Sequence, residues 1–80
     1  MTFGQAIESA KGGVRIAREG WNGKDMWLTY VAAEDYAIVE PLVGSRELLP
    51  FLAMKTADNK IVPWLASQTD MLATDWVEVG

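Results

Sequence analysis

The 80-residue chain contains no cysteine and no histidine, and each absence removes a class of chemistry. Without cysteine there is no disulfide and no thiolate metal site, which fits a reducing compartment. Without histidine there is no imidazole to act as a base near neutral pH or to bind a metal. The glycines match neither a phosphate-loop pattern nor a dinucleotide-binding pattern. We therefore expect a protein that is not an enzyme, with no catalytic residues, no metal site and no cofactor.

Long apolar runs and an excess of positive charge are also missing. No apolar stretch approaches the ~20 residues of a membrane-spanning helix. The N-terminus lacks the basic and apolar regions of a secretory signal. The net charge is −4, the wrong sign for a surface that binds the backbone of a nucleic-acid polymer. The sequence thus predicts a soluble, cytoplasmic protein whose partners include no membrane and no nucleic-acid polymer.

What the chain does have is a large apolar share in a small size. Eighty residues predict a single domain, residues 1–80, that buries only roughly 60% of its unfolded surface when it folds alone. Half of the residues are apolar and four are tryptophans, more apolar surface than a small monomer hides easily. We therefore expect a homo-oligomer whose subunits bury the surplus between them.

The residue pattern predicts an α+β fold, with a small antiparallel β-sheet of four to five strands, an N-terminal helix and a short C-terminal helix. Apolar residues at helical spacing place the first helix at about 3–11, with Thr2 and Gln5 as a capping box. Strands are predicted over 14–18, 26–31, 51–56, 60–64 and 76–79. Asn22-Gly23 is typical of a hairpin turn between the first two strands. Residues 32–48 allow no assignment.

Aromatic rings beside hydrogen-bonding groups suggest a binding site for a nucleotide-like ligand. Trp21, next to the predicted turn, and Trp64, after a proline, have faces on which a base can stack. The Asn22 amide can read the edge of such a base. A tryptophan beside a turn is about as often a core anchor, so both interpretations stay open. Trp27 and Trp76 are better explained by burial in the core or an interface.

A second candidate is the polar cluster Ser67, Gln68, Thr69 and Asp70, just before the predicted short helix. One of these side chains is needed as the helix cap, and Ser67 or Thr69 is suited to it. The remaining hydroxyl and amide groups, with the unpaired N–H groups of the helix start, suit a phosphate or a ribose. We favour ligand binding for the cluster as a whole and capping for any single member.

Three cations are candidates to neutralise a phosphate: Lys24, Lys55 and Arg18. For each of them taken alone, a solvated surface cation is the more typical interpretation. Asp70 and Asp75 are five residues apart across a short helix, so they need not face each other. A catalytic carboxylate pair is therefore not indicated.

Three sequence blocks, taken together and in order, resemble a known family. The blocks are Met1-Thr2-Phe3-Gly4-Gln5-Ala6, then residues 17–24 with Gly-Trp-Asn-Gly-Lys, then residues 49–76 with Pro-Trp-Leu-Ala-Ser-Gln-Thr-Asp and a closing Asp-Trp. This ordered set resembles the small phage anti-Thoeris proteins, the Thoeris anti-defence protein 2 family. The resemblance covers most of the chain except residues 32–48.

The resemblance implies a phage immune-evasion protein that sequesters a signal and does not degrade it. Thoeris defence makes a cyclic ADP-ribose isomer during infection. Family members hold this signal in pockets shared between subunits of a homotetramer, and some relatives hold cyclic di- or trinucleotides. For this chain the implied place of action is the cytoplasm of an infected bacterial host cell. The ligand-binding residues we expect are Trp21, Asn22, Lys24, Lys55, Trp64, Ser67, Gln68, Thr69 and Asp70.

Two other functions remain open from the sequence. One is an inhibitor that binds a host defence protein through the apolar surface. The other is a small hydrolase of cyclic nucleotides, for which the residues offer little support.

Overall fold

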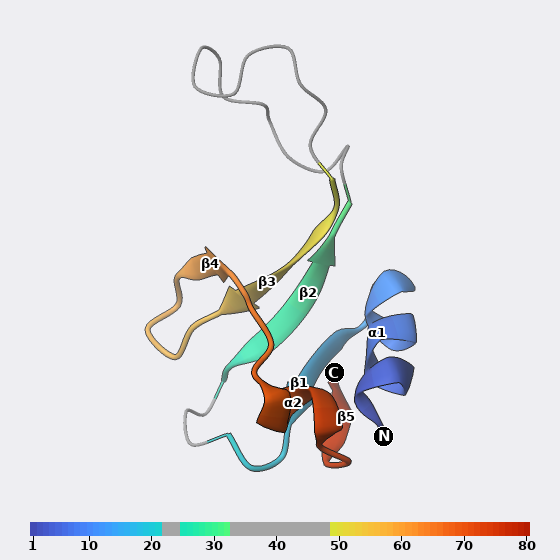
Figure 1. The fold of residues 1–80 in the computed structure, drawn as a ribbon. Helices are drawn as coiled ribbons and strands as arrows, with labels where there is room; N and C mark the ends of the chain where they lie inside the picture. The colour runs from blue at the N-terminus through green and yellow to red at the C-terminus, as the bar shows by residue number, and fades with distance from the viewer. Residues whose placement is uncertain (22–24, 33–48) are drawn as a thin grey trace.

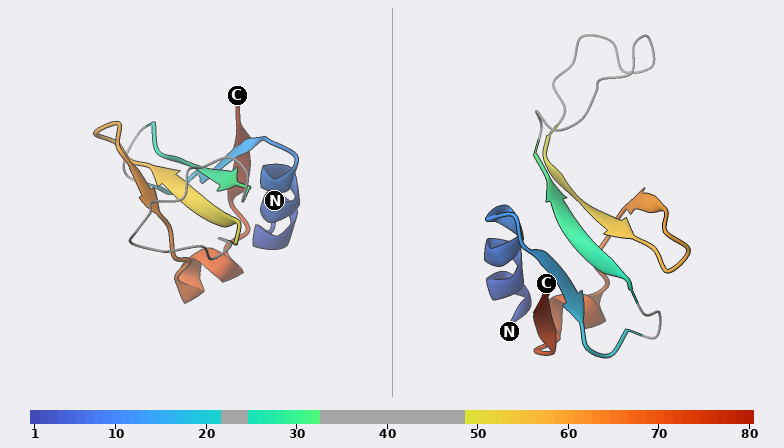
Figure 2. Two further views of the ribbon diagram at one scale, coloured as in Figure 1. Left: turned by 90° about the horizontal axis from the view of Figure 1, so that it is seen from above. Right: turned by 180° about the vertical axis from the view of Figure 1, so that it is seen from behind.

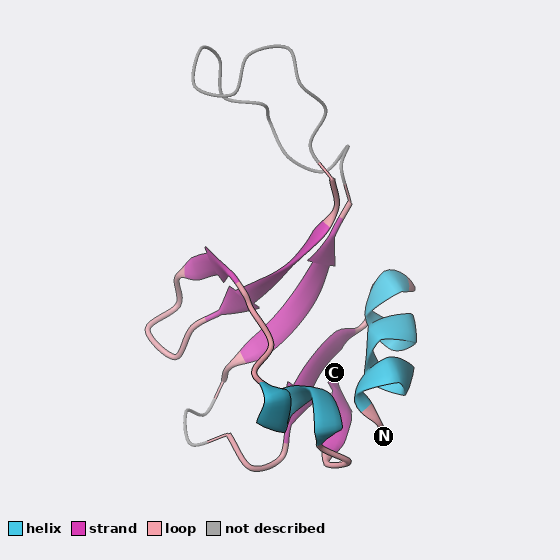
Figure 3. Ribbon diagram, viewed as in Figure 1, coloured by secondary structure: helices cyan, strands magenta, loops and turns pink. Residues whose placement is uncertain are grey.

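The computed structural model describes residues 1–21, 25–32 and 49–80, and it confirms the predicted α+β class. A five-stranded antiparallel sheet is joined to an N-terminal helix and a short helix near the C-terminus (Figures 1 and 3). In chain order the elements are α1 (Phe3–Lys11), β1 (Arg15–Arg18), β2 (Trp27–Val31), β3 (Phe51–Lys55), β4 (Ile61–Pro63), α2 (Gln68–Leu72) and β5 (Trp76–Val79). The predicted turn at Asn22-Gly23, the candidate Lys24 and residues 33–48 lie outside the described residues.

Helix α1 begins with the capping box that the sequence predicts. The Thr2 side chain accepts a hydrogen bond from the Gln5 backbone N–H, and the Gln5 side chain accepts one from the Thr2 N–H. These two bonds satisfy donors that the first helical turn leaves unpaired. Ala6 and Ala10, one turn apart, are buried. Small side chains on this stripe let α1 approach the sheet closely.

The sheet order is β4-β3-β2-β1-β5, so β5 and β4 form its two edges. Strands β3 and β4 form a hairpin, and the turn between them includes Asn59 at a positive φ of 66°. Asparagine tolerates this left-handed conformation better than most residues. Pro63, which has no N–H to donate, is the last residue of the edge strand β4.

The core lies between α1 and one face of the sheet. Ile16 of β1, Leu28 of β2 and Trp76 of β5 are fully buried there, together with the two alanines of α1. Trp76 is thus a core residue, as predicted. Figure 2 shows the sheet and α1 from two further sides. No helix within the described segments is long and apolar enough to cross a membrane.

The sheet face away from α1, which we call the outer face, carries Arg15, Trp27 and Lys55. Successive side chains of a strand alternate between faces, so these residues point away from the core positions Ile16 and Leu28. Trp27 and Lys55 are paired across β2 and β3. Ala17 also belongs to the outer face, yet only 7% of it is exposed. Ala17 and Ile16 of β1 are therefore both buried, although their side chains point to opposite faces of the sheet.

Candidate functional site

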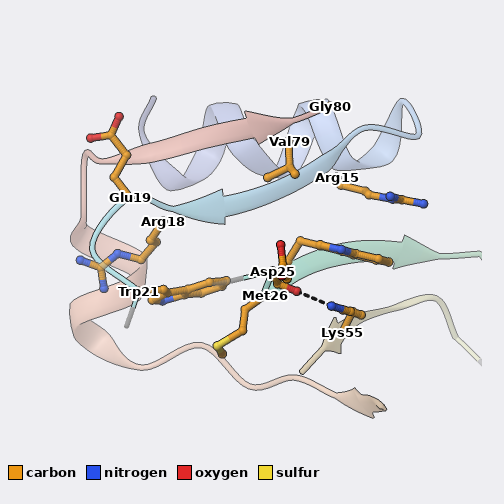
Figure 4. Close-up of a pocket in the computed structure, with 10 residues that line it drawn as sticks. Arg15, Arg18, Glu19, Trp21, Asp25, Met26, Lys55, Val79 and Gly80 are labelled. Carbon is orange, nitrogen blue, oxygen red and sulfur yellow. Dashed lines mark hydrogen bonds between the residues drawn. The ribbon is translucent and has the colours of Figure 1, made fainter. Parts of the chain in front are cut away.

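A cleft of about 530 Å³ runs over the end of the sheet where the β1–β2 connection begins. Its walls come from β1, from both flanks of the β1–β2 connection, and from the ends of β3 and β5. The lining residues are Arg15, Arg18, Glu19, Trp21, Asp25, Met26, Trp27, Lys55, Val79 and Gly80. Figure 4 shows Arg18, Glu19 and Trp21 at one end of the cleft, with Arg15 and Lys55 toward the other. The volume falls within the usual range for small-molecule sites.

The end nearer the outer face combines an aromatic ring with two cations. The Arg15 guanidinium carbon lies 4.3 Å from the centroid of the Trp27 ring, a cation–π arrangement. Lys55 is the cross-strand partner of Trp27. Its Nζ donates a hydrogen bond to the Asp25 carbonyl oxygen at 2.7 Å (Figure 4). This end can therefore offer positive charge and an aromatic edge to a ligand.

The other end is organised by Arg18, the last residue of β1. Its Nε donates to Asp75 Oδ1 and its Nη1 donates to Asp70 Oδ1, both at 2.9 Å. The side chains are shielded from water, with 18% of Arg18, 16% of Asp70 and 32% of Asp75 exposed. The second oxygen of Asp75 accepts the Gly20 N–H at 3.1 Å. Arg18 thus ties together β1, α2 and the segment that precedes β5.

These contacts shift the pKa values of Arg18, Asp70 and Asp75 in the directions that favour their charged forms. Hydrogen bonds to Asp75 and then to Asp70 raise the pKa of Arg18 above its already high value. The hydrogen bond from Arg18 lowers the pKa of Asp75. Burial alone raises the pKa of Asp70, but the hydrogen bonds from Ser67 and Arg18 outweigh it and leave this pKa lowered. All three groups are therefore charged at neutral pH, and the charge of Arg18 is already compensated.

Trp21 belongs to an aromatic cluster as well as to the cleft. Its ring meets Trp64 edge-on at 6.3 Å and Trp76 edge-on at 5.5 Å between centroids. Phe3 of α1 completes the cluster at 5.2 Å from Trp76. Trp21 and Trp64 are only partly buried. Trp21 therefore packs against the core, which is one of the two interpretations that the sequence left open, and it also lines the cleft. Its stacking on a base stays a prediction.

The polar cluster before α2 is engaged in capping that helix. The Ser67 hydroxyl accepts the Asp70 N–H at 3.1 Å, and the Asp70 carboxylate accepts the Ser67 N–H at 3.1 Å. This is a capping box, with Ser67 as the N-cap. Gln68 and Thr69 are exposed in the first turn. The structure therefore assigns the cap to Ser67 and not to Thr69.

The structure brings together some of the sequence-predicted residues and separates others. Trp21 and Lys55 both line the cleft, whereas the candidates Asn22 and Lys24 lie outside the described residues. Trp64 touches Trp21 but is not a lining residue. The cleft is not lined by the polar cluster either, which consists of Ser67, Gln68, Thr69 and Asp70. Asp70 is nevertheless in contact with one lining residue, because it forms an ion pair with Arg18.

Sequence reasoning missed two features of this site. It gave Arg15 no role, although the alternation of β1 places this arginine on the face of the sheet that Trp27 shares. It also treated Asp70 and Asp75 as unrelated, whereas both bind Arg18. The first feature was visible in the strand pattern once the pairing of 14–18 with 26–31 was assumed. The second depends on contacts across 52 and 57 residues, for which the sequence holds no local signal.

Comparison with known proteins then identifies the family. The family described as "Thoeris anti-defense 2-like domain" matches residues 1–79. The chain belongs to this family. A curated relative, "Thoeris anti-defense 2" of Bacillus phage SP01, is 42% identical over 86 residues, and the match covers 95% of this chain and 91% of the relative. The resemblance seen in the sequence blocks is thereby confirmed.

Membership in the Thoeris anti-defense 2-like family extends over nearly the whole chain. The match from residue 1 to 79 includes every described element and every residue that lines the cleft except Gly80. The cleft, the Arg18 contacts and the aromatic cluster therefore all lie within the family domain. A functional proposal for this cleft is a proposal about the domain itself.

Proposed function

We propose that this protein binds and sequesters a cyclic ADP-ribose-type signalling nucleotide without degrading it, and so counters Thoeris defence in the cytoplasm of an infected bacterium. The observation that carries the proposal is the cleft itself, where Trp21 and Trp27 lie with Arg15 and Lys55. A nucleotide combines a flat base with anionic phosphates, so it needs both an aromatic surface and nearby cations. The name of the phage relative, "Thoeris anti-defense 2", supports the biological part.

The size and openness of the cleft fit sequestration by an assembly better than by one chain. A sponge must outcompete the signal's receptor, and nanomolar binding corresponds to about −12 kcal/mol. For a ligand of roughly forty heavy atoms this is about −0.3 kcal/mol per atom, a typical value for a ligand that is well enclosed. A cleft at the surface of a single subunit leaves part of such a ligand in water. A second copy of the chain over the cleft would enclose it.

We propose accordingly that the chain forms a homo-oligomer, a tetramer as the family resemblance implies. Seven large apolar side chains are exposed among the described residues, and most of them fall in β4, α2 and the segment between. Leu65 is 91% exposed and Leu72 is 78% exposed. Burying such side chains against a second copy yields about 25 cal/mol for each Å² of apolar surface. This gain favours association of identical chains over a free monomer.

The described residues near the cleft support binding over catalysis. The carboxylates of Asp70 and Asp75 both bind Arg18 near one end of the cleft, and both have lowered pKa values. A general acid for hydrolysis needs the opposite, a pKa raised toward neutral. The chain also has no histidine to serve instead. Release of an unaltered ligand is therefore the expected behaviour.

The test is an incubate-and-release assay. The purified protein is mixed with cyclic ADP-ribose isomers and with cyclic di- and trinucleotides, the free ligand is removed by filtration, and the retained fraction is heated. Mass spectrometry then identifies what is released. Lys55→Gln is the site variant, and Lys60→Gln, on the exposed β3–β4 turn, is the matched control.

Three outcomes separate the candidate functions. Recovery of intact ligand from wild type and Lys60→Gln, with loss from Lys55→Gln, supports sequestration in the cleft. Recovery of an altered ligand would replace the proposal with a cyclic nucleotide hydrolase. If no ligand is retained, the proposal fails, and an inhibitor that binds a host protein through the exposed apolar side chains becomes the better account.

A further inference from the structure

Arg15 and Lys55 are the cleft cations whose charge no described carboxylate neutralises. Within residues 1–21, 25–32 and 49–80, the ion pairs involve Lys11, Arg18 and Lys60, and neither Arg15 nor Lys55 takes part in one. Lys55 donates only to a carbonyl oxygen, that of Asp25. A carbonyl group fixes the ammonium in place but leaves its net charge available. The two side chains therefore offer positive charge that is outside any ion pair among the described residues, in a cleft that Asp25 also lines.

The contact with Trp27 prepares Arg15 for an anion. The Arg15 guanidinium carbon lies 4.3 Å from the centroid of the Trp27 ring, so the ring supports the cation on one side. Among the described residues no ion-pair partner occupies its N–H donors, which leaves them for a ligand. Holding the long side chain in one position also reduces the entropy that binding would otherwise cost.

Lys55 lies on the other side of the same tryptophan. Trp27 and Lys55 are direct partners across β2 and β3, so their Cβ atoms are about 5 Å apart. Arg15 comes from β1, the other neighbour of β2. Arg15 contacts the Trp27 ring and Lys55 is held at the Asp25 carbonyl oxygen, so two cations line the same cleft and repel each other when no anion is present. A group with two adjacent negative charges, such as a pyrophosphate, relieves this repulsion.

The opposite end of the cleft has a different electrostatic character. Arg18 is bound by both Asp70 and Asp75, and Glu19 lines the same end with its carboxylate turned away from Trp21 (Figure 4). This end therefore carries more negative than positive charge. Because Arg15 begins β1 and Arg18 ends it, the two ends are about 10 Å apart along the strand. A phosphate is repelled at one end and attracted at the other.

We propose that Arg15 and Lys55, on either side of Trp27, form the phosphate subsite of the cleft, so that the ligand lies with its phosphates over the outer face and its base and sugar toward Trp21. Arg18 takes no part in binding phosphate and instead holds the wall that carries Trp21. The identity of the whole ligand rests on the proposed function, whereas the anion subsite rests on the geometry of these three side chains.

The test uses two probes, inorganic pyrophosphate and a cyclic ADP-ribose isomer, on the intact chain. Binding is measured by calorimetry, and the Arg15 Nε–H and Trp27 indole signals are followed by NMR. Arg15→Gln and Lys55→Gln remove the charges, and Arg15→Lys keeps the charge but loses the planar fork. Lys11→Gln and Lys60→Gln are controls that remove exposed cations outside the cleft.

The expected result is that each glutamine variant weakens binding of both probes about tenfold or more, because a hydrogen bond to a charged group contributes about 1.5–3 kcal/mol. Arg15→Lys gives an intermediate loss, and the controls bind as wild type does. Raising the salt from about 0.05 M to about 0.5 M weakens wild-type binding, and weakens binding by Arg15→Gln less. The Arg15 and Trp27 signals shift on addition of pyrophosphate.

The outcomes distinguish this inference from the proposed function. If the cyclic ADP-ribose isomer binds tightly and the Arg15 and Lys55 variants bind it equally well, the subsite is overturned and sequestration stands. If pyrophosphate binds and shifts the Arg15 and Trp27 signals while no cyclic nucleotide binds, the subsite stands and the proposed function fails. If neither probe binds to wild type, the subsite is overturned too.

Discussion

Arg18 and Asp75, 57 residues apart in the chain, are joined by a hydrogen bond of 2.9 Å between Nε and Oδ1. The same carboxylate accepts the Gly20 N–H through its other oxygen, so Asp75 fixes both the end of β1 and the residue before Trp21. A Cβ at Gly20 would lie only 3.2 Å from that oxygen, which shows how closely the two segments approach. The wall of the cleft that presents Trp21 is therefore supported from the C-terminal part of the chain.

The first prediction concerns the coupling between Arg18 and its carboxylates. Arg18→Gln is expected to lower the Tm because it leaves the partly shielded carboxylates of Asp70 and Asp75 without their cation. Asp75→Asn is expected to lower it as well, because Arg18 then keeps only Asp70 as a charged partner. The double variant is expected to lose less than the sum of the two, since the second change no longer breaks an intact pair. Thermal unfolding followed by circular dichroism measures this. Strictly additive losses would show that the pair is not coupled.

The second prediction concerns stability at acid pH. The folded chain holds the pKa of Asp70 and of Asp75 below the ordinary value of 3.8, so the unfolded chain binds protons at higher pH than the folded chain does. The resulting stability is complete well above pH 4 and is lost as the pH falls below it. The denaturant midpoint should therefore decrease on acidification, and less steeply in Arg18→Gln. An equal slope in both proteins would rule out Arg18 as the cause.

The third prediction concerns which residue caps the start of α2. Ser67→Ala removes the N-cap hydroxyl and is expected to cost about 1 kcal/mol of unfolding free energy. Thr69→Ala, an exposed change in the same turn, is expected to cost less than about 0.5 kcal/mol. Urea unfolding gives both values. A larger loss for Thr69→Ala than for Ser67→Ala would contradict the observed cap.

Local features of the fold were predictable from the sequence because they depend on neighbouring residues. The box of Thr2 and Gln5 and the positions of the strands follow from spacing within a few residues. The sequence suited Ser67 and Thr69 equally as the helix cap, and the backbone conformation at the start of α2 makes Ser67 the N-cap.

The site was less predictable, because it depends on which strands are neighbours. Arg15 meets Trp27 only because β1 and β2 are paired. Arg18 was one candidate for a phosphate cation, with a solvated surface group as the more typical interpretation. Instead two distant carboxylates bind it, because β5 and α2 come to lie near the end of β1. Long-range contacts of this kind produce no periodic pattern in the sequence from which they could be predicted.

The fourth prediction concerns Trp21, whose ring packs against the core and also lines the cleft. Trp21→Ala should weaken ligand binding about tenfold or more, since stacking of an aromatic ring on a base is worth about 1–3 kcal/mol. It should also lower the Tm, because the edge contacts with Trp64 and Trp76 are lost. Trp21→Phe keeps an aromatic face and serves as the control for packing. Full affinity in Trp21→Ala, with assembly intact, would remove Trp21 from the site.

The fifth prediction concerns assembly. Wild type should sediment as a species several times heavier than the 8.8 kDa chain, and Leu72→Glu should shift it toward the monomer by placing a charge in the apolar contact. Ala57→Glu adds the same charge on the exposed β3–β4 turn and should leave the assembly unchanged. A wild-type protein that sediments only as an 8.8 kDa species would refute the proposed oligomer.

The most direct test of sequestration is an equilibrium titration of cyclic ADP-ribose isomers into the purified protein by calorimetry. The account predicts that at least one isomer binds with a Kd near the nanomolar range, about −12 kcal/mol, and that the ligand is recovered unchanged afterwards. Affinities no better than about 1 mM for every isomer, about −4 kcal/mol, would contradict it, because so weak a binder cannot withdraw a signal from its receptor.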